Sequence, residues 1–125
     1  MGQITTERIG TAWVVRLDGW FITDQDAVLI HEAMHNSPAD VRCVVVNWSG
    51  IRHISSTSLG AAMKGASDVL KQGRQYRNCE FSERAALIVK AFRNSFPWNY
   101  FETEQQALTA CSSADVDDAR PTVGT

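Results

Sequence analysis

The chain has 125 residues, 44% of them hydrophobic and 21% charged, and its formal net charge at pH 7 is -2. This length and composition are typical of one globular domain and argue against a fibrous or wholly disordered chain. Basic side chains concentrate in residues 64–93, a pattern more typical of solvated helix faces than of a nucleic-acid groove, so we expect no nucleic-acid partner.

The cysteines and the start of the chain indicate a cellular compartment. Cys43, Cys79 and Cys111 are odd in number, widely spaced and without a CxxC pair, which favours reduced, buried thiols over a disulfide framework or a zinc site. No basic-then-apolar signal segment opens the chain, and its apolar runs are only a few residues long. We therefore expect a cytoplasmic protein without direct membrane insertion and without a cofactor.

Two strands and a helix are expected first. Residues 3–9 and 12–17 flank a break at Gly10 and predict a hairpin. Apolar side chains then recur at helical spacing and predict a helix over residues 25–36, with Thr23 or Asp24 as its N-cap. The apolar face of this helix consists of Ala27, Ile30, Ala33 and Met34.

The middle of the chain predicts a buried strand followed by a second helix. Residues 43–46 form a nearly continuous apolar run, the pattern of a strand covered on both faces. We expect a loop over residues 47–55. Apolar residues at helical spacing then predict a helix over residues 56–72.

The last third is less regular. A weaker strand is expected over residues 75–81, followed by a helix that Ser82 caps and Pro97 ends. Residues 100–101 are expected to form a short strand before a helix over residues 103–111. Residues 112–125 contain too little apolar surface to bury and are expected to be a disordered tail.

This order of elements predicts an α/β fold in a single domain, residues 1–111. Two strands followed by alternating helices and strands imply a mostly parallel sheet of four to five strands, with an antiparallel first strand, about four helices and right-handed crossovers.

Four consecutive hydroxyls, Ser55, Ser56, Thr57 and Ser58, open the second expected helix. One interpretation is purely structural: the first serine is a good N-cap and the others belong to the turn. The other is functional, because a hydroxyl in the first turn of a helix lies at the carboxyl edge of a parallel sheet, where open α/β folds keep their sites. A phosphate added there is tolerated by the helix N-terminus but repels a docked partner.

The segment WSGIRHISSTSLG, residues 48–60, resembles the STAS family, whose members run a strand into LSGVxxIDSSGLG and then an amphipathic helix. The similarity covers roughly residues 12–110. It includes RLDGWF near the start and NYFETEQQALTA near the end, which is similar to the closing F…TEEEAL helix of the family.

The resemblance implies a non-enzymatic, phosphorylation-switched module of the anti-sigma factor antagonist type. In such proteins the serine that matches Ser56 is phosphorylated by an anti-sigma factor with serine-threonine kinase activity. The unphosphorylated form binds that kinase, and a serine phosphatase restores it. Two positions differ from the family, because Ser55 replaces an aspartate and Ser58 a glycine, so Ser55, Thr57 and Ser58 are alternative phosphorylation sites.

We expect the partner to contact the hydroxyl-rich loop and the helix that follows it. The predicted contact residues are Trp48, Ile51, His53, Ser55, Ser56, Thr57, Ser58, Leu59 and Met63. Trp20, Trp48 and Trp98 all fall in or beside expected loops, where an aromatic ring packs under a turn or anchors a partner. Packing is the default for each, and Trp48 is included here because it directly precedes the hydroxyls.

Two other functions compete with this one. STAS-like domains also serve as accessory subunits of membrane transport or of signalling scaffolds.

In addition, residues 31–35, HEAMH, match the HExxH pattern in which two histidines hold zinc and a glutamate acts as base. The helical wheel leaves His31 on the flank of the core face and turns Glu32 and His35 to solvent, and His53 lies in a different loop. A chance match without metal is favoured, and zinc hydrolysis is the remote alternative.

Overall fold

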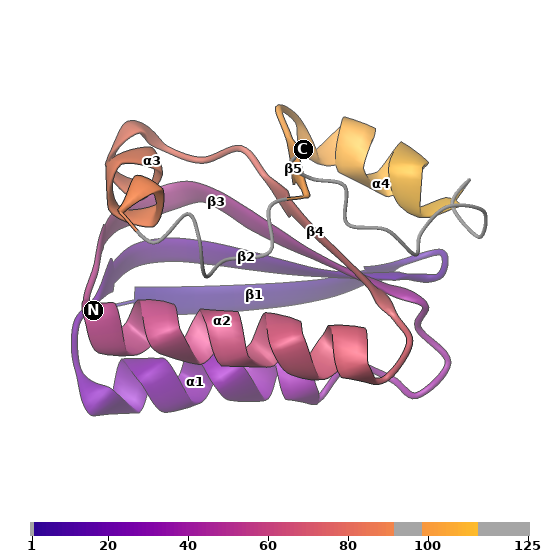
Figure 1. Ribbon diagram of the computed structural model, residues 1–125, viewed down its shortest axis with the longest axis horizontal. Helices are drawn as coiled ribbons and strands as arrows, with labels where there is room; N and C mark the ends of the chain where they lie inside the picture. The colour runs from indigo at the N-terminus through magenta and orange to yellow at the C-terminus, as the bar shows by residue number, and fades with distance from the viewer. Residues whose placement is uncertain (1, 92–98, 113–125) are drawn as a thin grey trace.

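The computed structural model describes residues 2–91 and 99–112. These residues form a five-stranded sheet with four helices around it (Figure 1). In chain order the elements are β1 (Gly2–Ile9), β2 (Ala12–Phe21), α1 (Asp24–His35), β3 (Cys43–Ile54), α2 (Ser56–Lys71), β4 (Gln75–Cys79), α3 (Glu83–Lys90), β5 (Tyr100–Phe101) and α4 (Glu104–Ser112).

The strands lie in the sheet in the order in which they occur along the chain. β1 pairs with β2 in antiparallel orientation, and the pairs β2–β3, β3–β4 and β4–β5 are all parallel. This arrangement confirms the predicted α/β class, including the antiparallel first strand.

Both faces of the central strands are buried, which explains their continuous apolar sequence. On one face Val15, Val44 and Val46 belong to the larger core cluster, to which α1, α2 and α3 also contribute. On the other face Val14 and Val45 belong to a smaller cluster with α4. Figure 1 shows α1 and α2 side by side along one face of the sheet and α4 on the opposite side.

The expected loop over residues 47–55 is wrong. β3 continues to Ile54 and remains paired with β2, which itself runs to Phe21. The pairing shifts register between Arg16 and Asp18 and again between Gly19 and Trp20. Such bulges let a strand continue through polar and glycine residues that by composition alone predict a turn.

The expectation that all three cysteines are reduced is also wrong. Cys43 and Cys111 are joined by a disulfide across a sequence separation of 68, and only Cys79 is free among the described residues, where it is buried. Sequence spacing could not reveal this pair, because the link depends on α4 ending over the start of β3.

Helix caps set the starts of α1, α2 and α3. Thr23, Ser55 and Ser82 each accept a hydrogen bond from the backbone N–H three residues later, as N-caps do. Ser82 is thus confirmed as a cap. The prediction that Pro97 ends the third helix is wrong, because α3 already ends at Lys90. Pro97, Trp98 and residues 113–125 of the expected tail lie outside the described residues. No helix in the described ranges is long and apolar enough to cross a membrane.

The start of α1 is fixed by a reciprocal capping box. The carboxylate of Asp26 accepts hydrogen bonds from the backbone N–H groups of Ile22 and Thr23, both at 2.9 Å, while its own N–H donates to Oγ1 of Thr23 at 3.1 Å. The bond from the Thr23 N–H is the largest cause that holds the pKa of Asp26 below its ordinary value. The ionised carboxylate therefore stabilises this turn.

Replacing Gly50 is expected to disturb the pairing that leads to the end of β3. A Cβ at Gly50 would lie 2.6 Å from Oδ1 of Asp18 and 2.9 Å from the carbonyl oxygen of Leu17. Because the carbonyl belongs to the backbone of β2, the clash cannot be relieved by a side-chain rotation. We expect Gly50→Ala to lower the free energy of unfolding by about 2 kcal/mol, measured by urea denaturation.

Gly60 provides the matched control, because it is helical and a Cβ there would meet nothing within 4 Å. Gly60→Ala is expected to raise the free energy of unfolding by up to about 1 kcal/mol. Equal stability of Gly50→Ala and the unmodified protein would show that the β2–β3 contact at this point is not tight.

Asp26→Asn is expected to lower stability in a pH-dependent way. The folded pKa of Asp26 is depressed, so its contribution is present above the unfolded value of about 4 and is lost as the pH falls through the folded pKa. The variant should lose about 1 kcal/mol at pH 7, the usual effect of a lost cap, and the difference should shrink below about pH 4. Urea denaturation at several pH values measures this, with the exposed Asp24→Asn as control. A difference independent of pH would contradict the assignment.

Candidate functional site

The junction between β3 and α2 is held by backbone and side-chain bonds of Ser55. Its N–H donates to the carbonyl oxygen of Phe21 at 2.8 Å, and its own carbonyl accepts from the N–H of Leu59 at 2.8 Å. Its Oγ accepts from the N–H of Ser58 at 3.1 Å. Ser55 is therefore the N-cap that the sequence predicted, and its groups serve the structure of the turn.

The four consecutive hydroxyls differ in exposure. Ser56 is the first residue of α2, and both Ser56 and Thr57 are exposed, whereas Ser55 is half-buried. Ser58 is fully buried, and its Oγ has no hydrogen-bond partner among the described residues. A protein that approaches this edge of the sheet therefore meets the hydroxyls of Ser56 and Thr57.

Four of the predicted contact residues do not reach the surface. Trp48, Ile51, Ser58 and Leu59 are each at most 2% exposed. The Trp48 indole N–H donates to Oδ1 of Asn78 at 3.0 Å, and its ring meets Phe81 edge-on. These side chains support the site from beneath, because β3 continues where the sequence predicted an open loop. His53 and Met63 are half-buried, and Met63 packs against the larger core cluster.

Exposed apolar side chains lie at the end of β2 and in the first turns of α1. Trp20, Ile22 and Val28, which we call the Trp20 patch, are 48%, 51% and 47% exposed. The Trp20 ring lies 6.3 Å from the His53 ring, and these two residues are register partners of β2 and β3. Trp20 and Ile22 also flank Phe21, whose carbonyl binds Ser55. The backbone of β2 next to Trp20 is therefore joined to the N-cap of α2.

A groove of about 460 Å³ between α1 and α2 extends the same surface. From α1 it is lined by Ala27, Val28, His31 and Glu32, and from α2 by Thr57, Gly60, Ala61 and Lys64. Val28 of the Trp20 patch and Thr57 thus face one depression. Trp20 was expected beside a loop, whereas Ile22 and Val28 were not predicted to be exposed contact residues. The available signal for Val28 was its position off the core face of an amphipathic helix.

The HExxH residues form a contact between helices. His31 and His35 stack with their ring centroids 5.9 Å apart, and Nε2 of His31 lies 3.3 Å from Oδ2 of Asp68 on α2. This hydrogen bond, and then the charge of Lys64, hold the pKa of Asp68 below its ordinary value. His31 is half-buried and Glu32 and His35 are exposed, as the helical wheel predicted. Within residues 2–91 and 99–112, no group of three or more His, Cys, Asp or Glu side chains is placed to hold a metal ion.

Comparison by sequence finds no match, since no family model and no curated protein matches the chain. Comparison by structure does find matches. SpoIIAA of Bacillus, an anti-sigma factor antagonist, matches in its unphosphorylated form with a TM-score of 0.67 and 17% identity, over 89% of this chain and 99% of that chain. Its phosphorylated form gives a TM-score of 0.63 at 18% identity, over 86% and 97%.

Two further proteins share the fold. An anti-sigma factor antagonist from Mycobacterium paratuberculosis gives a TM-score of 0.66 at 19% identity, over 90% of this chain and 95% of that chain. A sulfate transporter family protein from Wolinella succinogenes gives 0.69 at 13% identity, over 83% and 87%. At these identities the similarity establishes the fold. The chain has the STAS-like α/β architecture of these anti-sigma factor antagonists.

Proposed function

We propose that this protein is a phosphorylation-switched binding module of the anti-sigma factor antagonist kind. It binds a kinase-type anti-sigma factor while Ser56 is unphosphorylated, is released when that kinase phosphorylates Ser56, and is restored by a serine phosphatase. It acts in the cytoplasm in transcription regulation and is not itself an enzyme. The main support for this proposal is the exposed Ser56 at the start of α2. In addition, the fold is shared with an antagonist whose structure is known in unphosphorylated and phosphorylated forms.

Ser56 is the best phosphate acceptor among the four hydroxyls. Ser58 is sealed in the core, and the Ser55 Oγ already accepts the capping hydrogen bond. Thr57 is exposed but lines the groove between α1 and α2. Ser56 has neither constraint and occupies the position that matches the phosphorylated serine of the STAS pattern.

The start of α2 can tolerate a phosphate. The first turn of this helix contains no acidic residue, so an added dianion meets no like charge there. The helix N-terminus carries partial positive charge and unpaired backbone N–H groups, which favour an anion. Phosphorylation should therefore leave the fold intact.

The same phosphate should prevent docking of a partner. A protein interface gains most of its affinity from a few dehydrated aromatic and apolar anchors. Trp20, whose ring lies near His53 just before α2, and Val28, which lines a groove together with Thr57, offer such anchors. A dianion at the centre of that surface must be dehydrated or left unpaired when the partner docks, which costs several kcal/mol. The phosphate then acts on binding and leaves stability almost unchanged.

A second candidate function is that of an accessory subunit of a membrane transport or signalling complex. It is favoured by the structural match to the sulfate transporter family protein from Wolinella succinogenes. Stable co-purification with a membrane transport complex, together with no affinity for an anti-sigma factor, would favour it over the first proposal.

Ser56→Asp is expected to weaken binding to the kinase-type anti-sigma factor encoded in the same genome by more than about tenfold. The melting temperature should stay nearly constant, because the substitution adds charge at an exposed helix start. Isothermal titration calorimetry measures the affinity, and Ser56→Ala should retain it. The matched charge control is Gln105→Asp on α4, on the opposite side of the sheet. Equal affinities of Ser56→Asp and Ser56→Ala would refute the switch.

Trp20→Ala is expected to weaken the same interaction by about 2 kcal/mol, the usual effect of removing an aromatic anchor. The control is Leu87→Ala on α3, because Leu87 is 67% exposed but does not belong to the Trp20 patch. Both variants should keep their fold, as checked by circular dichroism. If Leu87→Ala weakens binding and Trp20→Ala does not, the partner docks on another surface.

A further inference from the structure

The helix α4 is held to the sheet at both of its ends. At its start the carboxylate of Glu104 accepts two hydrogen bonds from Arg16, at 3.0 and 2.7 Å, and one from Asn47 at 2.9 Å. The N–H of Glu104 donates to the carboxylate of Glu80 at 2.7 Å. The bonds from Arg16, and then the bond from Asn47, hold the pKa of Glu104 below its ordinary value. This end is fixed by charge and does not depend on a covalent link.

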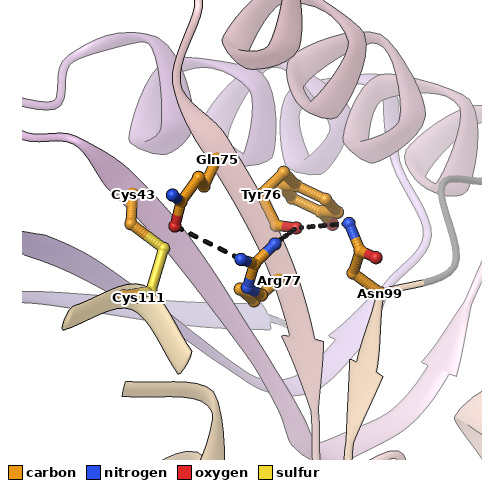
Figure 2. The surroundings of a disulfide bond; sticks show 6 residues. All are labelled: Cys43, Gln75, Tyr76, Arg77, Asn99 and Cys111. Atoms are coloured by element: carbon orange, nitrogen blue, oxygen red, sulfur yellow. Dashed lines mark hydrogen bonds between the residues drawn. A yellow bond between two sulfur atoms is a disulfide. The ribbon is translucent and has the colours of Figure 1, made fainter. Parts of the chain in front are cut away.

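The far end of α4 is fixed by the disulfide between Cys43 and Cys111. Their Cα atoms are 5.9 Å apart, within the usual range for such a bond. Figure 2 shows the bond between β3 and α4, next to the β4 residues Gln75 and Arg77. Gln75 is the register partner of Cys43, so Arg77 places a permanent positive charge on the same face of the sheet.

Cys111 of this disulfide lines an open pocket. The pocket has a volume of about 270 Å³ and is lined by residues 9–12 between β1 and β2 and by Gln105, Leu108, Thr109 and Cys111 of α4. Cys43 is 0% exposed, whereas Cys111 is 9% exposed. Cys111 therefore lies in the wall of the pocket, whereas Cys43 does not line it.

The third cysteine, Cys79, is poorly suited to react with the disulfide. Cys79 belongs to the same core cluster but is fully buried. Burial, and then the charges of Glu80 and Glu104, raise its pKa to about 12. Its thiol stays protonated at neutral pH and is a poor nucleophile.

We propose that Cys43–Cys111 is a reversible thiol–disulfide exchange site, opened by low-molecular-weight thiols that enter through the pocket beside Cys111. A small thiolate attacks Sγ of Cys111, and the bond to Cys43 breaks with its electron pair on Cys43, which then takes a proton. A second small thiol attacks the mixed disulfide and releases Cys111 as a thiol, together with a small-molecule disulfide. Two electrons thus pass from two thiols to the protein.

Opening the bond releases one end of α4 and leaves the other in place. Glu104 keeps its contacts with Arg16 and Asn47, whereas Cys111 retains only its packing contacts. The redox state of the surroundings then sets how firmly this helix covers the smaller core cluster. This inference is independent of the phosphorylation proposal, because it concerns the opposite face of the sheet and different residues.

The test is alkylation of the full chain purified without reductant, followed by mass spectrometry. Only Cys79 should be labelled after denaturation, and all three cysteines after prior native treatment with reduced glutathione. Reduction should lower the melting temperature by about 5–10 °C and speed hydrogen exchange near the end of α4. The protein should remain folded by circular dichroism throughout.

The entry route is tested by two tryptophan variants. Thr109→Trp fills the pocket and should slow native reduction by about tenfold, because exchange depends on access. Gln106→Trp, on the same helix but outside the pocket, and Cys79→Ser should leave the rate unchanged. Three labelled cysteines before any reduction, reduction only after unfolding in urea, or an unaltered rate for Thr109→Trp would each overturn the proposal.

Discussion

The parallel pairing of β2 with β3 positions the candidate site, because it continues past two register shifts as far as Phe21 and Ile54. One further hydrogen bond, from the Ser55 N–H to the Phe21 carbonyl, joins the ends of both strands. The helices α1 and α2 therefore start side by side. Trp20, near the end of β2, lies opposite His53 of β3, two residues before Ser55. The site is a consequence of this pairing rather than of a loop with its own conformation.

The two proposed controls lie on opposite faces of the sheet. The face covered by α1 and α2 presents the accessible Ser56 and the groove lined by Val28 and Thr57, where the proposed partner would be expelled by an added anion. The opposite face carries α4, held by Glu104 at one end and by a disulfide at the other. An exchangeable bond there agrees with the proposed cytoplasmic location, because cytosolic disulfides are usually transient or redox-sensing.

Much of the fold could be predicted from the sequence, because periodicity and caps are local. The apolar run at residues 43–46 marked the central strand, and Ser55 and Ser82 marked helix starts. The continuation of β3 could not be predicted, since it depends on β2 pairing through bulges. For the same reason Trp48 was expected near the surface but lies in the core. The Cys43–Cys111 disulfide could not be predicted either, because the pairing depends on where α4 ends.

Ser56 is the residue on which the proposed kinase acts. To test this, the unmodified protein is incubated with the kinase-type anti-sigma factor of the same genome and ATP, and any phosphate is located by fragmentation mass spectrometry. We expect one phosphate, on Ser56, and none on the buried Ser58. Phosphate on Ser58, or no phosphate anywhere from Ser55 to Ser58, would contradict it.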